Sequence, residues 1–305
     1  MKIFIHTKFQ DSEIQKFKDA LSPKYDVIIG QELSLEEQKT QFLDAEICYG
    51  NVPLDWAIET TKLQWLQLNS TGLDPYQKLT DYQYKITNLK GFFGQSVAET
   101  ALAGILGMYR RIDELARLQT KSEWVGTPIR ETLFLLHKAK VLILGSGAIG
   151  LKTQQLLSGF ECETTVLNSK TISQLSEYLP DTDILIATLP ETAETIGLIN
   201  KEYLSMLKPS ALFVNVGRGS AVDENALIEI LQANKIFGAV LDVTELEPLP
   251  TESPLWNMPN VLLTQHSSGG WAKESFEKVV FFLANLDHFE KGEELTNNVD
   301  LVKGY

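Results

Sequence analysis

The 305-residue sequence has little cysteine and histidine, and fewer basic than acidic residues. Its two cysteines, Cys48 and Cys162, are far apart in apolar contexts, so we expect unpaired thiols, a reducing cytoplasmic location and no metal site. The formal net charge of −13 repels phosphate backbones and anionic lipid, which argues against nucleic-acid or membrane partners. No apolar run approaches the roughly 20 residues of a membrane helix. The start, MKIFIHTKFQ, is typical of a first strand and not of a signal peptide.

Short apolar runs alternate with helical periodicity along the chain. In the helical segment SEIQKFKDAL, for example, Ile14, Phe17 and Leu21 share one face. This alternation is typical of βαβ units, in which a largely parallel sheet is covered on both faces. The strand-like runs of the first hundred residues are KIFIH, YDVIIG, EICYG, LQWLQLN and YKITN.

A second series of strands follows one long helical stretch, SVAETALAGILGMYRRIDELARLQ. Its six runs match the strand count of a full dinucleotide-binding sheet; they are AKVLILG, ETTVLN, DILIAT, ALFVNV, FGAVLD and NVLLT. A last helix is expected in WAKESFEKVVFFLANLDHFEKG. We therefore predict an α/β protein of two Rossmann-like domains. The six-stranded parallel dinucleotide-binding domain spans 97–274, and a smaller flavodoxin-like substrate domain is formed by 1–96 plus 275–305.

A glycine pattern marks the start of the second series. VLILGSGAIG fits G-x-G-x-x-G, follows an apolar strand and opens a helix, which is the context that dinucleotide binding requires. The first glycine makes a tight turn, the second lets the backbone approach a pyrophosphate, and the third lets the helix pack on the strand. The alternative is a glycine-rich turn without a ligand. The loop residues expected to bind the cofactor are Gly145, Gly147, Ala148, Ile149 and Gly150.

The next strand ends in TTVLNSK, where an NAD-type fold usually places a carboxylate about 20 residues after the glycines. This chain has Asn168, Ser169 and Lys170 there. A carboxylate would repel the 2′-phosphate of NADP, so its absence favours NADPH over NADH as the cofactor. The alternative interpretation is a solvated turn.

Charged residues follow other strands of this series, at the edge where open α/β sheets bind ligands. Arg218 lies between two glycines, Glu247 lies in ELEPLP, and His266 follows the sixth strand. A guanidinium grips a carboxylate through two parallel hydrogen bonds, a histidine moves a proton near neutral pH, and a carboxylate stabilises the imidazolium. Hydride transfer to a 2-keto acid needs these three groups. Singly, each of these residues is more often a surface or structural group, so the prediction depends on their joint placement at one edge of the sheet.

Six blocks of the sequence, in order, resemble the D-isomer-specific 2-hydroxyacid dehydrogenases. The resemblance implies an NAD(P)-dependent enzyme, similar to glyoxylate/hydroxypyruvate reductases, that interconverts a small 2-keto acid and a D-2-hydroxy acid. It implies that Arg218 anchors the substrate carboxylate, His266 is the acid/base and Glu247 is its partner. The blocks are SVAETALAGIL, VLILGSGAIG, LPETAETIGLIN, NVGRGSAVDENAL, GAVLDVTELEPLP and LTQHSSGG.

The resemblance implies further contacts and a partner. The backbone N–H groups of Thr71 and Gly72 would bind the substrate carboxylate, and Tyr49 and Asn51 are candidates for the side-chain pocket. A homodimer through the cofactor domain is implied, which would explain the long apolar helix from Ser96. Asp242 would contact the nicotinamide carboxamide, and the other expected cofactor contacts are Thr188, Leu189, Pro190, Val216, Gly217 and Ser268.

Three positions depart from the family pattern. Asn168 replaces an acidic residue, Gln265 replaces a proline before the histidine, and Thr244 replaces an aromatic residue. None removes a catalytic group, and substrate identity stays open. Glu247 argues against the formate dehydrogenases of the superfamily, which pair the histidine with glutamine. A nucleotide-sensing regulatory protein on the same fold is the alternative function, because fold does not fix function.

Overall fold

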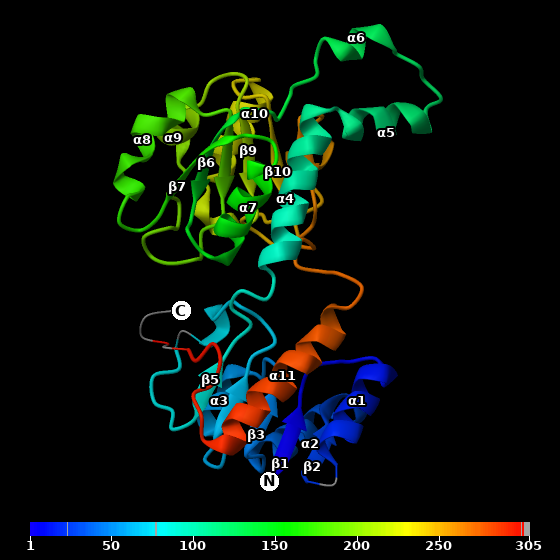
Figure 1. Ribbon diagram of the computed structural model, residues 1–305, viewed down its shortest axis with the longest axis vertical. Coiled ribbons are helices and arrows are strands. Elements are labelled where there is room, and N and C mark those ends of the chain that lie inside the picture. The colour runs from blue at the N-terminus through cyan, green and yellow to red at the C-terminus, as the bar shows by residue number, and fades with distance from the viewer. Residues whose placement is uncertain (23, 77, 300, 302–305) are drawn as a thin grey trace. The chain divides into compact units, whose positions relative to one another are not determined.

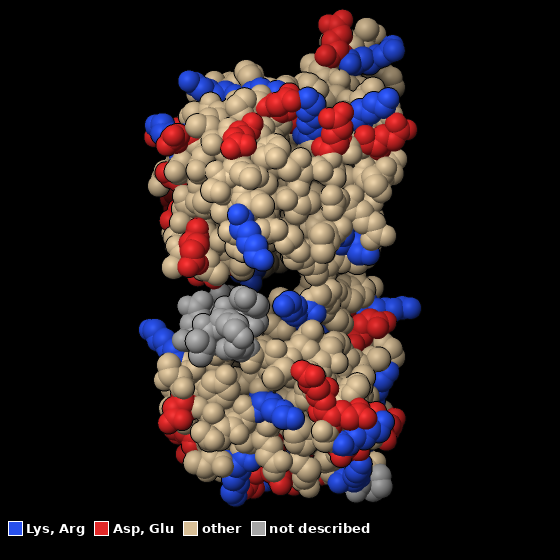
Figure 2. Space-filling view, turned by 60° about the vertical axis from the view of Figure 1, so that its left-hand side comes forward, with Lys and Arg blue, Asp and Glu red and all other residues tan. Residues whose placement is uncertain are grey.

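A computed structural model describes residues 1–22, 24–76, 78–299 and 301 of the protein (Figure 1). The chain forms two compact units, one of Met1–Phe92 with Trp271–Tyr305 and one of Phe93–Gly270. Each unit contains one parallel sheet, which confirms the predicted fold class. None of the described helices combines the length and apolar character that crossing a bilayer requires. The face shown in Figure 2 carries basic and acidic side chains interspersed.

The first unit holds five strands in the order β2-β1-β3-β4-β5, the order of flavodoxin-like folds. Every strand lies within a run expected from the sequence. The strands are β1 (Lys2–Ile5), β2 (Asp26–Ile29), β3 (Ile47–Tyr49), β4 (Trp65–Gln67) and β5 (Lys85–Thr87). The helices are α1 (Asp11–Leu21), α2 (Leu35–Leu43), α3 (Leu54–Glu59) and α11 (Glu274–Lys291).

Helix α11 comes from the end of the chain but packs in the first unit, where it lies beside α1 (Figure 1). The wholly buried ring of Phe282 stacks on Tyr49 and on Trp65, with centroid distances of 4.9 and 5.2 Å. Phe17 of α1 meets the same ring edge-on at 5.8 Å. Aromatic rings bury large apolar areas, so this stack joins the helix to the sheet.

The second unit holds six parallel strands in the order β11-β10-β9-β8-β6-β7. After β7 the chain crosses to the other side of β6 to form β8, so the winding direction reverses between β6 and β8. Ligands of open α/β sheets bind at such a reversal, beyond the carboxyl ends of the strands. The strands are β6 (Lys140–Leu144), β7 (Glu163–Leu167), β8 (Ile184–Ala187), β9 (Leu212–Asn215), β10 (Gly238–Leu241) and β11 (Val261–Leu263).

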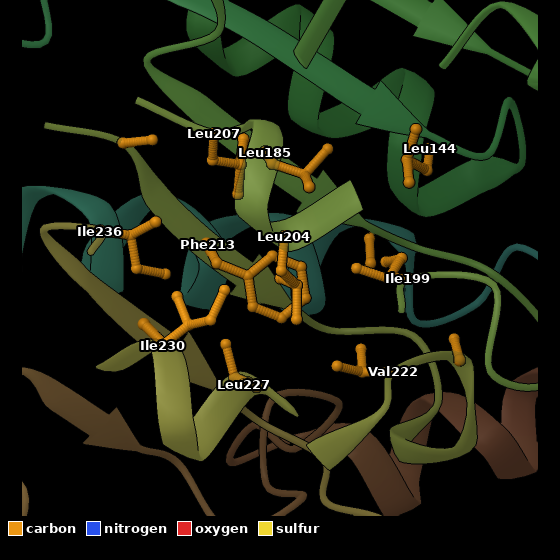
Figure 3. Close-up of a cluster of buried hydrophobic side chains, with 14 of the residues drawn as sticks. Leu144, Leu185, Ile199, Leu204, Leu207, Phe213, Val222, Leu227, Ile230 and Ile236 are labelled. Carbon is orange, nitrogen blue, oxygen red and sulfur yellow. The ribbon is translucent and has the colours of Figure 1, made fainter. Parts of the chain in front are cut away.

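Helices cover both faces of this sheet. Along β6, Leu142 and Leu144 point into one core, whereas Val141 and Ile143 point into the other. Figure 3 shows the first core, where Phe213 of the sheet lies among side chains of the covering helices that include Leu204, Leu227 and Ile230. Burial on both faces explains why the inner strands β8 and β10 are continuously apolar in sequence. The longer helices are α4 (Gly94–Tyr109), α7 (Ala148–Ser158) and α10 (Glu224–Gln232), and the shorter ones are α8 (Leu175–Tyr178) and α9 (Lys201–Met206).

The stretch 96–119, expected as one helix, forms two. Arg111 adopts a left-handed backbone with φ of 54° and separates α4 from α5 (Ile112–Thr120). The first helix packs so tightly that a Cβ at Gly104 would lie 2.5 Å from Val240 Cγ1. By contrast α5 has no buried residue, and it projects from the sheet with the short α6, Thr127–Arg130 (Figure 1). The apolar character of α4 is therefore explained by packing within its own unit.

Candidate active site

The glycine loop joins β6 to α7 at the reversal point. Gly145 has φ of 111°, and a Cβ there would lie 2.5 Å from Thr188 Oγ1. A Cβ at Gly150 would lie 2.0 Å from the Gly145 carbonyl oxygen, so the helix begins directly against the strand end. No described heavy atom lies within 4 Å of a Cβ at Gly147. The loop is thus closely packed at Gly145 and Gly150 and open at Gly147. Helix α7 begins at Ala148 and includes Ile149, so the free N–H groups of its first turn lie beside the open position. This arrangement fits a pyrophosphate.

The turn after β7 is organised by Asn168. Its Oδ1 accepts a hydrogen bond from Lys170 N at 2.9 Å, and its own N–H donates to Thr171 Oγ1 at 3.0 Å. Because the amide oxygen is used within the turn, the Asn168 NH₂ group remains for an outside partner. Ser169 and Lys170 are exposed beside it. An amide NH₂, a hydroxyl and an ammonium are hydrogen-bond donors, which suits a phosphate.

The glycines on both sides of Arg218 have a packing explanation. A Cβ at Gly217 would lie 2.6 Å from the backbone N and O of Leu189, and a Cβ at Gly219 would lie 1.9 Å from the Thr244 carbonyl oxygen. The Arg218 turn is therefore wedged between the loops that follow β8 and β10. The glycines make room for these neighbouring loops, and the arginine is held at the carboxyl edge of β9.

Residues expected to contact the cofactor from the loops after β8 and β9 lie at this edge. Thr188 donates its hydroxyl hydrogen bond to Leu144 O at 2.9 Å, which ties it to the end of β6. Leu189 and Val216 are buried, so they offer apolar surface or backbone groups. Pro190 continues the loop, and its carbonyl accepts the Thr195 hydroxyl at 2.6 Å.

His266 and Glu247 form a pair, with 2.6 Å between His266 Nδ1 and Glu247 Oε2. The other carboxylate oxygen accepts a hydrogen bond from Thr244 N at 3.1 Å, so both oxygens of Glu247 are oriented. The two side chains are 53% and 36% exposed and can be reached by a ligand. Since Nδ1 is used by the carboxylate, Nε2 is the nitrogen that can exchange a proton with a substrate.

Asp242 follows β10 and lies beneath the turn that carries His266. Its Oδ1 accepts hydrogen bonds from Thr264 Oγ1 at 2.6 Å, Ser267 N at 3.1 Å and Ser268 N at 3.2 Å. The Ser268 hydroxyl donates to Oδ2, and the Asp242 carbonyl accepts His266 N at 2.6 Å. The carboxylate expected at the nicotinamide carboxamide is thus engaged with the histidine turn, as is Ser268.

Sequence reasoning missed Asn215, the last residue of β9. This side chain is 1% exposed. Its Nδ2 donates to Arg218 O at 3.0 Å, and its Oδ1 accepts from Gly217 N at 3.1 Å. The signal was a single polar residue that closes the otherwise apolar run ALFVNV.

In the first unit, Thr71 and Gly72 follow β4. Asn88 Nδ2 donates to Thr71 O at 2.8 Å, and the Thr71 hydroxyl donates to Leu89 O at 3.0 Å. The backbone N–H groups of Thr71 and Gly72 make no hydrogen bond to another described residue. These hydrogen bonds fix the loop through the carbonyl and hydroxyl groups of Thr71, and the two backbone N–H groups are available for an anion.

Asn51 and Tyr49, both expected near a side-chain pocket, have structural roles. Asn51 Nδ2 donates to Ser70 Oγ at 2.9 Å and its Oδ1 accepts from Asn69 N at 2.8 Å, so Asn51 holds the Thr71 loop. The Tyr49 ring is wholly buried against Phe9 and Phe282, which argues against pocket lining. Elsewhere in the described chain, no group of three or more His, Cys, Asp or Glu side chains could hold a metal ion.

A glycine loop at the reversal point, together with an arginine and a histidine–carboxylate pair along the same edge, defines a nicotinamide-dependent oxidoreductase. Residues 102–268 match the family described as D-isomer specific 2-hydroxyacid dehydrogenase, NAD binding domain. Glyoxylate/hydroxypyruvate reductase A of Citrobacter koseri is 34% identical over 223 residues, which is 70% of each chain. The chain belongs to the D-isomer specific 2-hydroxyacid dehydrogenase family, and it is an NAD(P)-dependent dehydrogenase.

Solved structures show the same fold. A family protein from Aeromonas salmonicida superposes with a TM-score of 0.85 at 25% identity, covering 98% of this chain and 99% of that one. A D-isomer specific 2-hydroxyacid dehydrogenase from Xanthobacter autotrophicus, in complex with NADPH and MES, superposes with a TM-score of 0.82 at 26% identity. It covers 100% of this chain and 99% of its own. The family resemblance read from the sequence is confirmed.

The wedged turn around Arg218 predicts a steric effect at Gly219. Because its Cβ would meet backbone, Gly219→Ala should lower the free energy of unfolding by about 1–3 kcal/mol, measured by urea denaturation. Gly159→Ala is the control, since a Cβ there would lie 3.5 Å from Leu156 O, in ordinary contact. Equal stabilities of the two variants would contradict the packing explanation.

Proposed function

We propose that the protein reduces a small 2-keto acid with NAD(P)H, or oxidises the corresponding D-2-hydroxy acid, with Arg218 and the His266–Glu247 pair as its working groups. The observation that carries this proposal is the 2.6 Å pairing of His266 with Glu247 at the sheet edge that also bears Arg218 and the glycine loop. The glyoxylate/hydroxypyruvate reductases at 33–34% identity support glyoxylate or hydroxypyruvate as the substrate class.

The geometry supports a division of roles among the chain's residues. When bound, the nicotinamide supplies the hydride. The Arg218 guanidinium holds the substrate carboxylate through paired hydrogen bonds. Protonated His266 donates from Nε2 to the carbonyl oxygen during reduction, and neutral His266 takes the hydroxyl proton during oxidation. Glu247 orients Nδ1 and stabilises the imidazolium.

In the first unit, the loop of Thr71 and Gly72 is the proposed anion-binding element. The Thr71 and Gly72 amides are donors suited to a carboxylate, and Asn51 fixes their loop. We therefore assign the substrate domain to Met1–Phe92 with Trp271–Tyr305 and the cofactor domain to Phe93–Gly270. The two unpaired cysteines favour a reducing compartment, which we take to be the cytoplasm.

NADPH is the proposed cofactor in preference to NADH. The donors of Asn168, Ser169 and Lys170 match a 2′-phosphate, and no carboxylate in this turn opposes it. A structure of a relative at 26% identity contains NADPH, which supports the same choice. Asp242 remains a proposed contact of the nicotinamide carboxamide. Both of its carboxylate oxygens already accept hydrogen bonds from the turn that carries His266, so they would be shared with the carboxamide.

A homodimer through the cofactor domain is proposed, with α5, α6 and their linker as the contact. This projecting segment exposes Trp124 at 96% and Ile112 at 57%, together with Leu115 and Val125. Clustered exposed apolar side chains mark interaction sites. The segment thus replaces α4 as the basis for the dimer.

The substrate role of Arg218 is tested with glyoxylate, hydroxypyruvate and larger 2-keto acids, by following nicotinamide absorbance. Arg218→Lys keeps the charge but loses the planar fork, so kcat/KM should fall by about a hundredfold or more while NADPH affinity changes little. Near wild-type kcat/KM in this variant would sink the assignment. Cofactor binding by the wild type without turnover of any acid would instead favour a nucleotide sensor.

Cofactor choice is tested by Asn168→Asp. A carboxylate there repels the 2′-phosphate and removes the NH₂ donor, a charge-assisted contact being worth about 1.5–3 kcal/mol, so use of NADPH should fall about tenfold to a hundredfold relative to NADH. The measurement is kcat/KM with each cofactor. A wild type that already prefers NADH, or a variant with an unchanged ratio, would show that this turn is not the discriminator.

The proposed dimer contact is tested by sedimentation velocity. Ile112→Glu combined with Trp124→Ala should raise the dimer dissociation constant at least about a hundredfold, because a charge replaces an apolar contact in the interface. Ile58→Glu is the control, since Ile58 lies on α3 and is equally exposed at 56%. A monomeric wild type would refute the assignment. So would a dimer dissociation constant that rises equally in the double variant and in the Ile58→Glu control.

A further inference from the structure

Two buried polar side chains lie at the carboxyl ends of neighbouring strands, next to the turns that carry the proposed catalytic groups. Asn215 ends β9 and Asp242 follows β10; they are 1% and 3% exposed. Asp242 N donates to Asn215 O at 2.9 Å, which places the two residues side by side at the carboxyl edge. Burying such groups is unfavourable unless their hydrogen bonds are made, so the partners of each side chain define what it holds.

Asn215 holds the turn of Arg218. Its amide group bonds Gly217 N through Oδ1 and Arg218 O through Nδ2. The Arg218 guanidinium in turn donates from Nη1 to Gly217 O at 2.9 Å. Asn215 thus bonds the peptide group before Gly217 and the peptide group after Arg218. The carbonyl between them, Gly217 O, accepts the hydrogen bond from the arginine side chain.

Asp242 holds the turn of His266. Gln265 and His266 both have a left-handed backbone, with φ of 55° and 53°. Two successive non-glycine residues in this region are unfavourable and persist only where the surroundings impose them. The Asp242 carboxylate stabilises this turn because it accepts hydrogen bonds from residues on both sides of Gln265 and His266. These donors are Thr264 before them and Ser267 and Ser268 after them.

We propose that Asn215 and Asp242 are a matched pair of positioning residues, in which Asn215 sets the substrate anchor Arg218 and Asp242 sets the acid/base His266. This inference rests on the proposed function. Because the two residues act through different groups, their loss should affect different kinetic constants. An anchor that binds the carboxylate equally in the ground and transition states contributes to KM, whereas a misplaced proton donor lowers kcat.

The test is steady-state kinetics with NADPH and the preferred 2-keto acid. Asn215→Ala should raise KM for the acid about tenfold with kcat within about threefold of wild type. Asp242→Asn removes the negative charge and one of the two acceptor oxygens that hold the turn, and should lower kcat about a hundredfold with KM within about threefold. The solvent deuterium isotope effect on kcat should increase in Asp242→Asn alone, because proton transfer becomes limiting.

Asn260→Ala is the matched control. Asn260 also donates from Nδ2 to a backbone carbonyl, that of Leu231 at 3.1 Å, but it precedes β11 and so lies at the opposite edge of the sheet. This variant should lower the Tm without changing KM or kcat. If Asp242→Asn does not fold, Thr264→Val removes one donor to the same carboxylate and should lower kcat in the same direction. Parallel changes of KM and kcat in both positioning variants, or no change in either, would overturn the pairing.

Failure of the proposed function is distinguishable from failure of the pairing. If the wild type turns over no 2-keto acid, the function fails, and the pairing is judged from the ¹⁵N imidazole spectrum of His266 in the NADPH-bound protein. That resonance should shift in Asp242→Asn and stay in place in Asn215→Ala. A resonance that is unchanged in both variants, or shifted equally, would overturn the pairing.

Discussion

Burial of both faces of a parallel sheet is the constraint on which the second unit depends. Successive side chains of β6 enter different cores, so each position along the strand must be apolar. Polar chemistry is thereby confined to the strand ends. Because parallel strands all end at one edge, the glycine loop, Arg218 and His266 are brought to the same edge although they are far apart in sequence.

What could be predicted from the sequence follows from the same constraint. A doubly covered strand such as β8 or β10 leaves a continuous apolar run, so it could be predicted, and the residue after the run could be assigned to the binding edge. The break at Arg111 could not, since neither glycine nor proline marks it.

The site shows a similar division. Arg218, Glu247 and His266 could be found by chemical type and position, and the structure pairs the last two. The role of the glycines beside Arg218 could not be found, because it depends on the distance to Thr244 in a different loop. Asn215 was missed for the related reason that an amide at a strand end has no chemical signature until its partners are known.

The packing of α11 in the first unit has a consequence for biosynthesis. Phe282 completes the aromatic stack on Tyr49 and Trp65, yet it is translated after the whole second unit. The second unit is a continuous segment and can fold as it leaves the ribosome. The first 92 residues must wait with an incomplete apolar face until the last helix emerges. During synthesis, these first 92 residues are therefore the part of the chain whose core stays incomplete longest.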